Sequence, residues 1–377
     1  MEVPLLDLKK QYEEIKDEIQ EAINDVLEST QYIMGEHVKK LEEEIADYTN
    51  TKYGIGVASG TDALLLSLHA LDIGPGDEVI APTFTFFATA GVVSRLGATP
   101  VFADIDPVSY NIIPEEIEDK VTDKTKTIIP VHLYGQPAEM DKIMDIADKY
   151  DIKVVEDVCQ AIGAEYKGAQ VGNFGDTAAL SFFPSKNLGG YGDGGMVLTN
   201  DKELADRIKR LRVHGAEPKY YHKEVGYNSR LDAIQAAVLR VKLQYLDEWT
   251  KGRQRVADTY NKLFKEKGLD EEIVLPKKKV EDSTHVYHQY VIRVNNRNEV
   301  QRYLKENNIS TSVYYPKSLH LQECYNNLGY KKGDLPVAEK TCYEVLALPI
   351  DPNLSEEQIK YVVEKLKRMI NYNETSR

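Results

Sequence analysis

The sequence has few of the features that mark secreted, membrane-spanning or metal-binding proteins. Its three cysteines, Cys159, Cys324 and Cys342, lie far apart among 377 residues and form neither a disulfide framework nor a zinc-ligand pattern. No apolar run is long enough to cross a membrane, and the first residues do not resemble a signal peptide. We therefore expect a cytoplasmic protein that binds no metal ion.

Positive charge is also scarce. The chain has 47 Lys and Arg residues against 61 Asp and Glu residues, which gives a formal net charge of -14. This charge disfavours non-specific attraction to nucleic acid or to an anionic membrane. We expect neither as a partner, and an anionic small substrate would need local positive groups.

No internal repeat or low-complexity segment is present, and strands alternate with helices over the first two thirds of the chain. Near-continuous apolar strands between amphipathic helices indicate an α/β fold whose mostly parallel sheet is covered on both faces. The strands are expected at residues 53–58, 78–81, 100–103, 127–133, 153–157, 177–182 and 195–200.

Helical spacing predicts one amphipathic helix over residues 8–27 and one long, bent helix over 231–260. The rest of the chain is expected to form a small α+β domain, completed by the N-terminal helix. We divide the chain into residues 1–247, the N-terminal helices with a large domain, and residues 248–377, a small C-terminal domain. The small domain is expected to have strands at 286–294 and 310–313 and helices at 298–306, 335–344 and 356–370.

One lysine separates an apolar strand from a glycine-rich turn. Lys186 follows the strand at 177–182 and precedes Gly189 and Gly190, which indicate a tight loop with a close backbone approach. A partly desolvated amine at such a position has a lowered pKa and can attack a carbonyl. Considered alone, such a lysine would far more often be a surface residue with its ammonium group in water.

A candidate anion site lies at Ser59, Gly60 and Thr61, between a strand and a helix. Backbone N–H groups, hydroxyls and a glycine at a helix N-terminus can bind a phosphate. The alternative is that these residues only cap the helix.

A candidate carboxylate lies at the end of another strand. Glu156 and Asp157 finish a buried strand at the carboxyl edge, where open α/β sheets place their ligands. A buried carboxylate is costly without a positive partner, and a protonated pyridine nitrogen would be such a partner. A helix cap or a structural salt bridge is the alternative.

Aromatic residues follow a further strand, where Phe84, Phe86 and Phe87 could stack on a flat ring or pack in the core. Taken together, the phosphate cradle, the aromatic face, the carboxylate and the lysine predict a pyridoxal 5′-phosphate (PLP) site. In such a site the lysine forms a Schiff base, and the acid keeps the ring nitrogen protonated so that the ring accepts electrons.

Five blocks of the sequence resemble the nucleotide-sugar aminotransferases of the DegT family, which are fold type I PLP enzymes. The blocks are residues 59–64, 82–86, 156–161, 181–187 and 226–232. The resemblance spans nearly the whole chain and is highly specific in the lysine block and the Gly-Tyr-Asn-Ser-Arg block. It implies a three-layer α/β fold with a mostly parallel central sheet and a small C-terminal α+β domain.

The resemblance also implies roles for the residues that bind the cofactor ring. Lys186 would form the Schiff base and then move the proton between substrate and cofactor carbons. Asp157 would pair with the ring nitrogen, Gln160 would hydrogen-bond the ring hydroxyl, and Phe86 would stack on the ring.

Phosphate and substrate contacts follow from the same resemblance. Asn228 would reach the phosphate of the neighbouring subunit's cofactor, so that a homodimer with shared active sites would be required for activity. The other expected phosphate contacts are Ser59, Gly60, Thr61 and Ser181, and the expected substrate contacts are Tyr221, Tyr315 and His320.

The reaction implied is transfer of an amino group from L-glutamate to the 3-keto group of a dTDP-linked 3-keto-6-deoxyhexose. Gln160 stands where many C3-acting members have glutamine and C4-acting members often have histidine. The alternatives are a 4-aminotransferase acting on a GDP-, UDP- or dTDP-4-keto-6-deoxyhexose, a non-catalytic regulator on the same fold, and a dehydratase. Dehydratases of this fold have histidine in place of Lys186, and a Rossmann dehydrogenase would need a G-x-G-x-x-G after the first strand.

Overall fold

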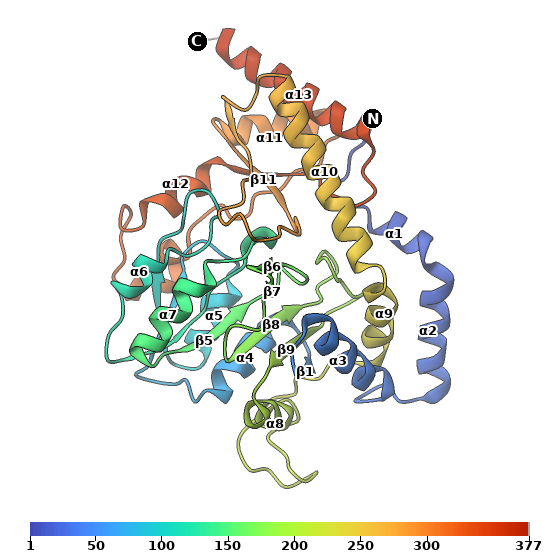
Figure 1. The fold of residues 1–377 in the computed structure, drawn as a ribbon, viewed down its shortest axis with the longest axis vertical. Helices are drawn as coiled ribbons and strands as arrows, with labels where there is room; N and C mark the ends of the chain where they lie inside the picture. The colour runs from blue at the N-terminus through green and yellow to red at the C-terminus, as the bar shows by residue number, and fades with distance from the viewer. Residues whose placement is uncertain (376–377) are drawn as a thin grey trace.

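A seven-stranded mixed sheet forms the centre of the larger part of the molecule (Figure 1). The computed structural model describes residues 1–375. The sheet has the order β1-β9-β8-β5-β4-β2-β3, and only β9 runs antiparallel to its neighbours. Its strands are β1 (Tyr53–Val57), β2 (Glu78–Pro82), β3 (Thr99–Ala103), β4 (Thr125–Ile128), β5 (Lys153–Asp157), β8 (Thr177–Ser181) and β9 (Gly195–Thr199). The predicted mostly parallel sheet is confirmed.

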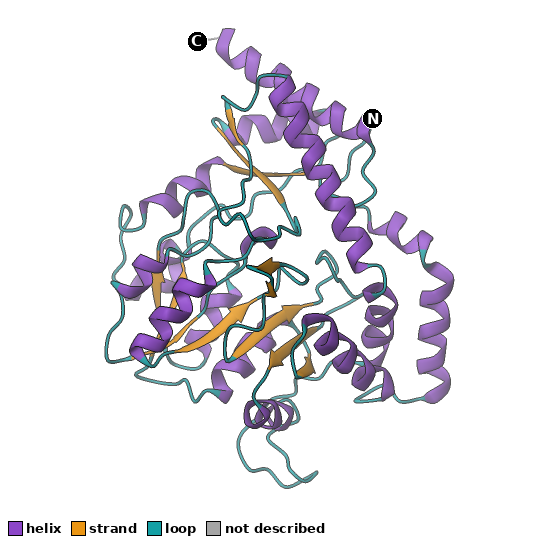
Figure 2. Ribbon diagram, in the orientation of Figure 1, coloured by secondary structure: helices purple, strands orange, loops and turns teal. Residues whose placement is uncertain are grey.

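Helices cover both faces of this sheet (Figure 2). Side chains that alternate along each strand enter two different cores, as Ile80 and its neighbour Val79 do on β2. One face packs against α4 (Gly60–Ala70), α5 (Ala88–Arg95) and α8 (Lys202–Leu211), and the other against α3 (Glu36–Thr49), α6 (Pro114–Glu118), α7 (Met140–Tyr150) and α9 (Ala233–Leu243). This is the expected three-layer α/β arrangement.

The smaller part is built on an antiparallel three-stranded sheet, in the order β10-β11-β12. Its strands are β10 (Ile273–Val274), β11 (Tyr290–Val294) and β12 (Val345–Leu348), and its helices are α11 (Arg297–Glu306), α12 (Pro336–Glu344) and α13 (Glu356–Thr375). The strand expected at 310–313 does not form, because Ser312 makes only an isolated bridge to Ala347 while the backbone before it pairs with Val3.

Two short elements and one long helix complete the chain. A two-stranded hairpin of β6 (Glu165–Tyr166) and β7 (Ala169–Gln170) lies beside the large sheet, and α10 (Leu246–Glu266) leads to the small domain. Leu246 belongs to the large core and Val256 to the small one, so the predicted division after residue 247 falls at the start of α10. Within residues 1–375, no helix combines the length and apolarity needed to cross a membrane.

The helix predicted over residues 8–27 is two helices, α1 (Leu8–Glu14) and α2 (Lys16–Ser29), which break at Ile15. The two halves dock on different surfaces. Ahead of α1, Val3 lies in the small-domain core and the Asp7 amide donates to Asp351 Oδ2 at 2.9 Å. On α2, Ile19 packs against Val238 of α9. The N-terminal segment, rather than a single N-terminal helix, therefore completes the small domain.

Candidate active site

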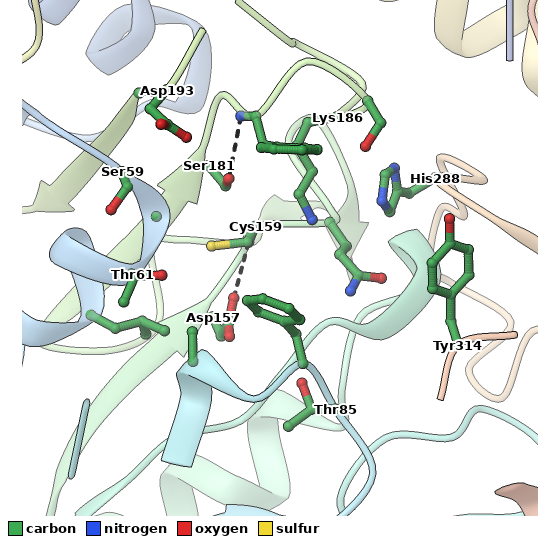
Figure 3. Close-up of a pocket in the computed structure, with 18 of the residues that line it drawn as sticks. Ser59, Thr61, Thr85, Asp157, Cys159, Ser181, Lys186, Asp193, His288 and Tyr314 are labelled. Carbon is green, nitrogen blue, oxygen red and sulfur yellow. Dashed lines mark hydrogen bonds between the residues drawn. The ribbon is translucent and has the colours of Figure 1, made fainter. Parts of the chain in front are cut away.

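One cavity of about 460 Å³ lies where β1, β2, β5 and β8 end (Figure 3). These four strands point the same way, so their carboxyl ends meet at one edge of the sheet, which is where open α/β sheets place ligands. Residues 288–289 and 314–315, from beyond α10, close the other side. The predicted residues that line it are Ser59, Gly60, Thr61, Phe86, Asp157, Gln160, Ser181, Lys186 and Tyr315.

The N-terminus of α4 forms one end of the cavity. Ser59 caps this helix, because its Oγ accepts a hydrogen bond from the Asp62 amide at 3.1 Å. The amides of Gly60 and Thr61 have no acceptor among the described residues. A Cβ added to Gly60 would lie 2.6 Å from the Cβ of Ser181. Two unpaired amides at a helix N-terminus, packed this closely, fit a phosphate group.

The two acidic residues at the end of β5 point in opposite directions. Glu156 is fully buried and accepts hydrogen bonds from the amides of Gly172, Phe174 and Gly175, each at 2.8 Å, and from His132. It therefore holds the backbone that leads into β8.

Asp157 faces the cavity instead. Its Oδ2 accepts from Thr89 Oγ1 at 2.9 Å and its Oδ1 from the Cys159 amide at 3.2 Å. The side chain is 6% exposed, and within the described chain no lysine, arginine or histidine forms a salt bridge with it. A buried carboxylate without a positive protein partner fits a cationic ligand such as a protonated pyridine.

Lys186 extends into the same cavity and is half-buried. Burial lowers the pKa of its ammonium group, and the nearby Cys159 and Asp157 side chains act in the opposite direction. No residue in the described chain accepts a hydrogen bond from its Nζ or forms a salt bridge with it. The arrangement gives an amine that is readily deprotonated and free to react.

Three further residues surround the space between Asp157 and Lys186. Gln160 accepts from the Tyr134 amide at 2.8 Å and donates to the Tyr315 hydroxyl at 3.2 Å. Phe86 is 56% exposed although its ring lines the cavity. A large exposed ring at a cavity rim is suited to stacking on a flat ligand.

The structure does not bring three of the predicted residues into the cavity of its own chain. His320 is 1% exposed and bonded to Thr83 Oγ1 at 2.6 Å and Glu339 at 3.2 Å, away from the cavity. Tyr221 is 71% exposed on the loop between α8 and α9, which projects from the molecule (Figure 1). Asn228 is exposed, next to buried Ser229, whose Oγ donates to Asp62 Oδ2 at 2.7 Å.

The cavity also contains residues that the sequence did not single out. Among them are Thr85, Asp193, His288 and Tyr314. His288 has no local signal, because it enters the cavity of Lys186 from a segment about a hundred positions further along the chain, just before β11.

A phosphate cradle, an unpaired carboxylate and a desolvated lysine on this three-layer fold define a PLP-dependent aminotransferase. Residues 13–367 match the DegT/DnrJ/EryC1/StrS aminotransferase family, and the chain belongs to it. The structure superimposes on S. venezuelae DesV in complex with a ketimine intermediate with a TM-score of 0.94 and 41% identity, covering 98% of each chain. The PLP form of Spr1654 from Streptococcus pneumoniae matches with a TM-score of 0.88 at 28% identity, covering 94% of this chain and 96% of that one.

Three relatives of known name span nearly the whole chain. The pleiotropic regulatory protein of Geobacillus stearothermophilus is 54% identical, covering 97% of this chain and 98% of its own. The UDP-2-acetamido-2-deoxy-3-oxo-D-glucuronate aminotransferase of Pseudomonas aeruginosa is 45% identical, covering 96% and 98%. The dTDP-3-amino-3,6-dideoxy-alpha-D-galactopyranose transaminase of Aneurinibacillus thermoaerophilus is also 45% identical, covering 97% and 99%.

Proposed function

We propose that this protein transfers the amino group of L-glutamate to the 3-keto group of a dTDP-linked 3-keto-6-deoxyhexose. The products would be a dTDP-3-amino-3,6-dideoxyhexose and 2-oxoglutarate. The observation that carries amino transfer is that the Lys186 amine and the Asp157 carboxylate, which has no cationic partner among the described residues, lie in one cavity with a phosphate cradle. The choice of the 3-position is supported by the two sugar aminotransferase relatives, both of which are named for chemistry at that carbon.

In this proposal each side chain has a defined task. When bound, PLP supplies an electron sink for the carbanion that forms at the substrate carbon. Lys186 would hold the cofactor covalently through Nζ and carry the proton on and off that carbon, which its lowered pKa favours. Asp157 would keep the ring nitrogen protonated, and Phe86 and Gln160 would fix the ring plane and its hydroxyl. Ser59, Gly60, Thr61 and Ser181 would bind the phosphate.

We further propose a homodimer with shared active sites. The charged residues that line the cavity of one chain are Asp157, Lys186 and Asp193, so a single subunit offers little positive charge to a nucleotide diphosphate. Asn228 is displayed on the surface beside the N-terminal turn of α4, where it would contact the cofactor phosphate of the neighbouring subunit. The projecting loop that carries Tyr221 would add contacts to the same neighbour.

A second substrate class is favoured by the equal identity of the Pseudomonas relative, which is named for a UDP-linked 2-acetamido-3-oxo sugar acid. The experiment offers the purified enzyme L-glutamate with dTDP-3-keto, dTDP-4-keto, GDP-4-keto and UDP-2-acetamido-3-keto sugars, and the amino sugars formed are identified by mass spectrometry and NMR. Amination of a 4-keto sugar alone would refute the proposed position. Amination of the UDP sugar alone would refute the proposed nucleotide.

A regulator without catalysis is raised by the name of the Geobacillus relative. Glutamate alone distinguishes the two functions, because an aminotransferase releases about one 2-oxoglutarate per PLP-loaded subunit. We expect this release from the wild type. Lys186→Ala should lose the absorbance of lysine-linked cofactor and lower turnover about a thousandfold or more, whereas full turnover by this variant would refute the assignment of Lys186.

A further inference from the structure

His288 is a buried histidine that the proposed roles leave unused. It lines the cavity together with Lys186, and Figure 3 shows both side chains on the same side of that space. It is 5% exposed and comes from the short segment that leads into β11. A histidine that shares a cavity with a reacting amine can act as a donor, as an acceptor or as a cation, and the surrounding hydrogen bonds decide among the three.

The hydrogen bonds define which ring nitrogen carries the proton. His288 Nδ1 lies 3.1 Å from Asn187 Oδ1, which can only accept. The other end of the same amide is fixed, since Asn187 Nδ2 donates to the Val286 carbonyl at 3.1 Å. His288 Nδ1 must therefore be the donor, and in the neutral ring Nε2 is left as an acceptor.

The electrostatic surroundings keep the ring neutral. Burial lowers the pKa of His288, and the positive charges of Lys186 and of Arg253 on α10 lower it further. Arg253 is itself fixed, because it donates to the Ile350 carbonyl at 2.9 Å. The ring therefore has an acceptor nitrogen, and within residues 1–375 nothing donates a hydrogen bond to it.

The Lys186 amine in the same cavity lacks a hydrogen-bond acceptor among the residues that the structure describes. The Lys186 ammonium can only donate, and it has no acceptor in the described chain. We propose that His288 is a positioning residue for amino transfer, whose Nε2 can accept a hydrogen bond from the Lys186 ammonium when that lysine is free and protonated. This contact orients Lys186 toward the substrate carbon and holds its proton ready for transfer. The inference depends on amino transfer at Lys186 and not on the identity of the sugar.

The test compares substitutions that separate the two ring nitrogens. His288→Asn retains a donor toward Asn187 but lacks the acceptor in the cavity, whereas His288→Gln places an amide oxygen near the position of Nε2. Asn187→Ala keeps the histidine but removes the acceptor that fixes the proton on Nδ1, so that Nε2 can carry the proton instead. The control is His285→Asn, a buried histidine of the same segment that does not line the cavity and whose Nδ1 accepts from the Tyr287 amide at 3.0 Å.

The first measurement uses the apoenzyme and needs no sugar substrate. The rate at which it combines with PLP is followed against pH, which reports the pKa of Lys186. Loss of an acceptor destabilises the ammonium, so His288→Asn and Asn187→Ala should move this profile to lower pH by about one unit. His288→Gln and the His285→Asn control should keep the wild-type profile, even if their melting temperatures fall.

The second measurement is the glutamate half-reaction of the PLP-loaded enzyme. His288→Asn should lower kcat about tenfold with KM unchanged, and His288→Gln should restore kcat to within about threefold of the wild type. An unshifted pH profile in both His288→Asn and Asn187→Ala would overturn the proposal, as would an equal shift in His285→Asn. The apoenzyme result stands even if the wild type fails to aminate every sugar, so the two proposals fail separately.

Discussion

At the scale of single residues, the site depends on which of two neighbouring side chains faces the cavity. Alternation along β5 directs Glu156 into the protein and Asp157 into the cavity. The first is satisfied by three amides and a histidine, and the second by a hydroxyl and one amide. The sequence places both carboxylates at the edge of the sheet, and the alternation then separates a structural acid from one that can serve a ligand.

The glycine at the start of α4 can be tested at this scale. Gly60→Ala would place a Cβ 2.6 Å from the Ser181 Cβ and 3.0 Å from Cys159 Sγ, in the wall of the phosphate cradle. Relief of this overlap must move α4 or β8, so we expect the Kd for PLP to rise about tenfold or more and stability to fall by about 1–3 kcal/mol. Absorbance titration of the apoenzyme with PLP measures the first effect.

A second glycine provides the control. A Cβ added to Gly74 meets no atom within 4 Å, so Gly74→Ala should bind PLP as the wild type does. If Gly60→Ala bound PLP with wild-type affinity, the N-terminus of α4 would not be the phosphate site.

At the scale of elements, α9 holds the loop that carries the lysine. Lys242 on α9 is 1% exposed and donates to the Gly189 carbonyl, three residues after Lys186. Its ammonium also lies 5.0 Å from the centre of the Tyr191 ring, and Gln235 of α9 accepts from the Tyr191 amide at 2.7 Å. The loop is thus fixed to a helix of the large domain by a buried lysine that has no carboxylate partner among residues 1–375.

The burial of Lys242 predicts a pH dependence of stability. Burial lowers its pKa from 10.5 to about 8, so between these values the unfolded chain binds more protons than the folded one, and stability rises with pH. At neutral pH the buried charge costs about 3 kcal/mol, and this cost disappears as the pH rises to 10.5. Lys242→Met keeps the apolar stem without the charge.

The measurement is the free energy of unfolding of both proteins in denaturant at pH 7 and pH 10. Relative to Lys242→Met, the wild type should gain about 2–3 kcal/mol at the higher pH. A stability difference that stays constant over this interval would mean that Lys242 is not charged in the folded protein at pH 7, or that its charge carries no burial cost.

Elements were predictable from the sequence where periodicity is local. The apolar runs of β5 and β8 are formed where the pattern indicates them. The break at Ile15 was not predictable, since helical spacing continues through it and the break follows from docking on two domains. The pairing of Val3 with Ile309, which replaces the strand expected at 310–313, is equally a matter of tertiary contact.

The candidate site likewise combines residues that local motifs predict with residues that only tertiary contacts bring together. Motifs that join a strand to a loop, such as those around Ser59, Asp157 and Lys186, placed their residues in the cavity. The resemblance of its segment predicts that His320 contacts substrate, but its ring is bonded to Thr83 and Glu339 and does not line the cavity. No local motif predicts that His288 belongs to the site, because only the fold brings it into the cavity of Lys186.

At the scale of the whole molecule, the cavity needs both domains. Its floor is formed by strand ends of the large sheet, while Tyr314 and Tyr315 come from the smaller part of the chain. The N-terminal segment ties the two parts together, because Val3 and Asp7 contact the small domain and Ile19 on α2 packs against α9 of the large one. A change in the relative position of the domains would therefore open the cavity, so the site is a property of the assembled chain rather than of either domain.

The same reasoning extends to two copies of the chain and predicts complementation between inactive variants. If Lys186 serves its own cavity and Asn228 the neighbouring one, then Lys186→Ala and Asn228→Asp each disable both sites of a homodimer, the second by placing a carboxylate against the phosphate. Refolding an equal mixture makes heterodimers in which one site has Lys186 from one subunit and Asn228 from the other. About a quarter of all sites should then be of wild-type composition. The recovered sites are measured by the glutamate half-reaction of the mixture, compared with that of each variant refolded alone. A mixture that is no more active than the mean of the two variants would show that Asn228 does not act across subunits.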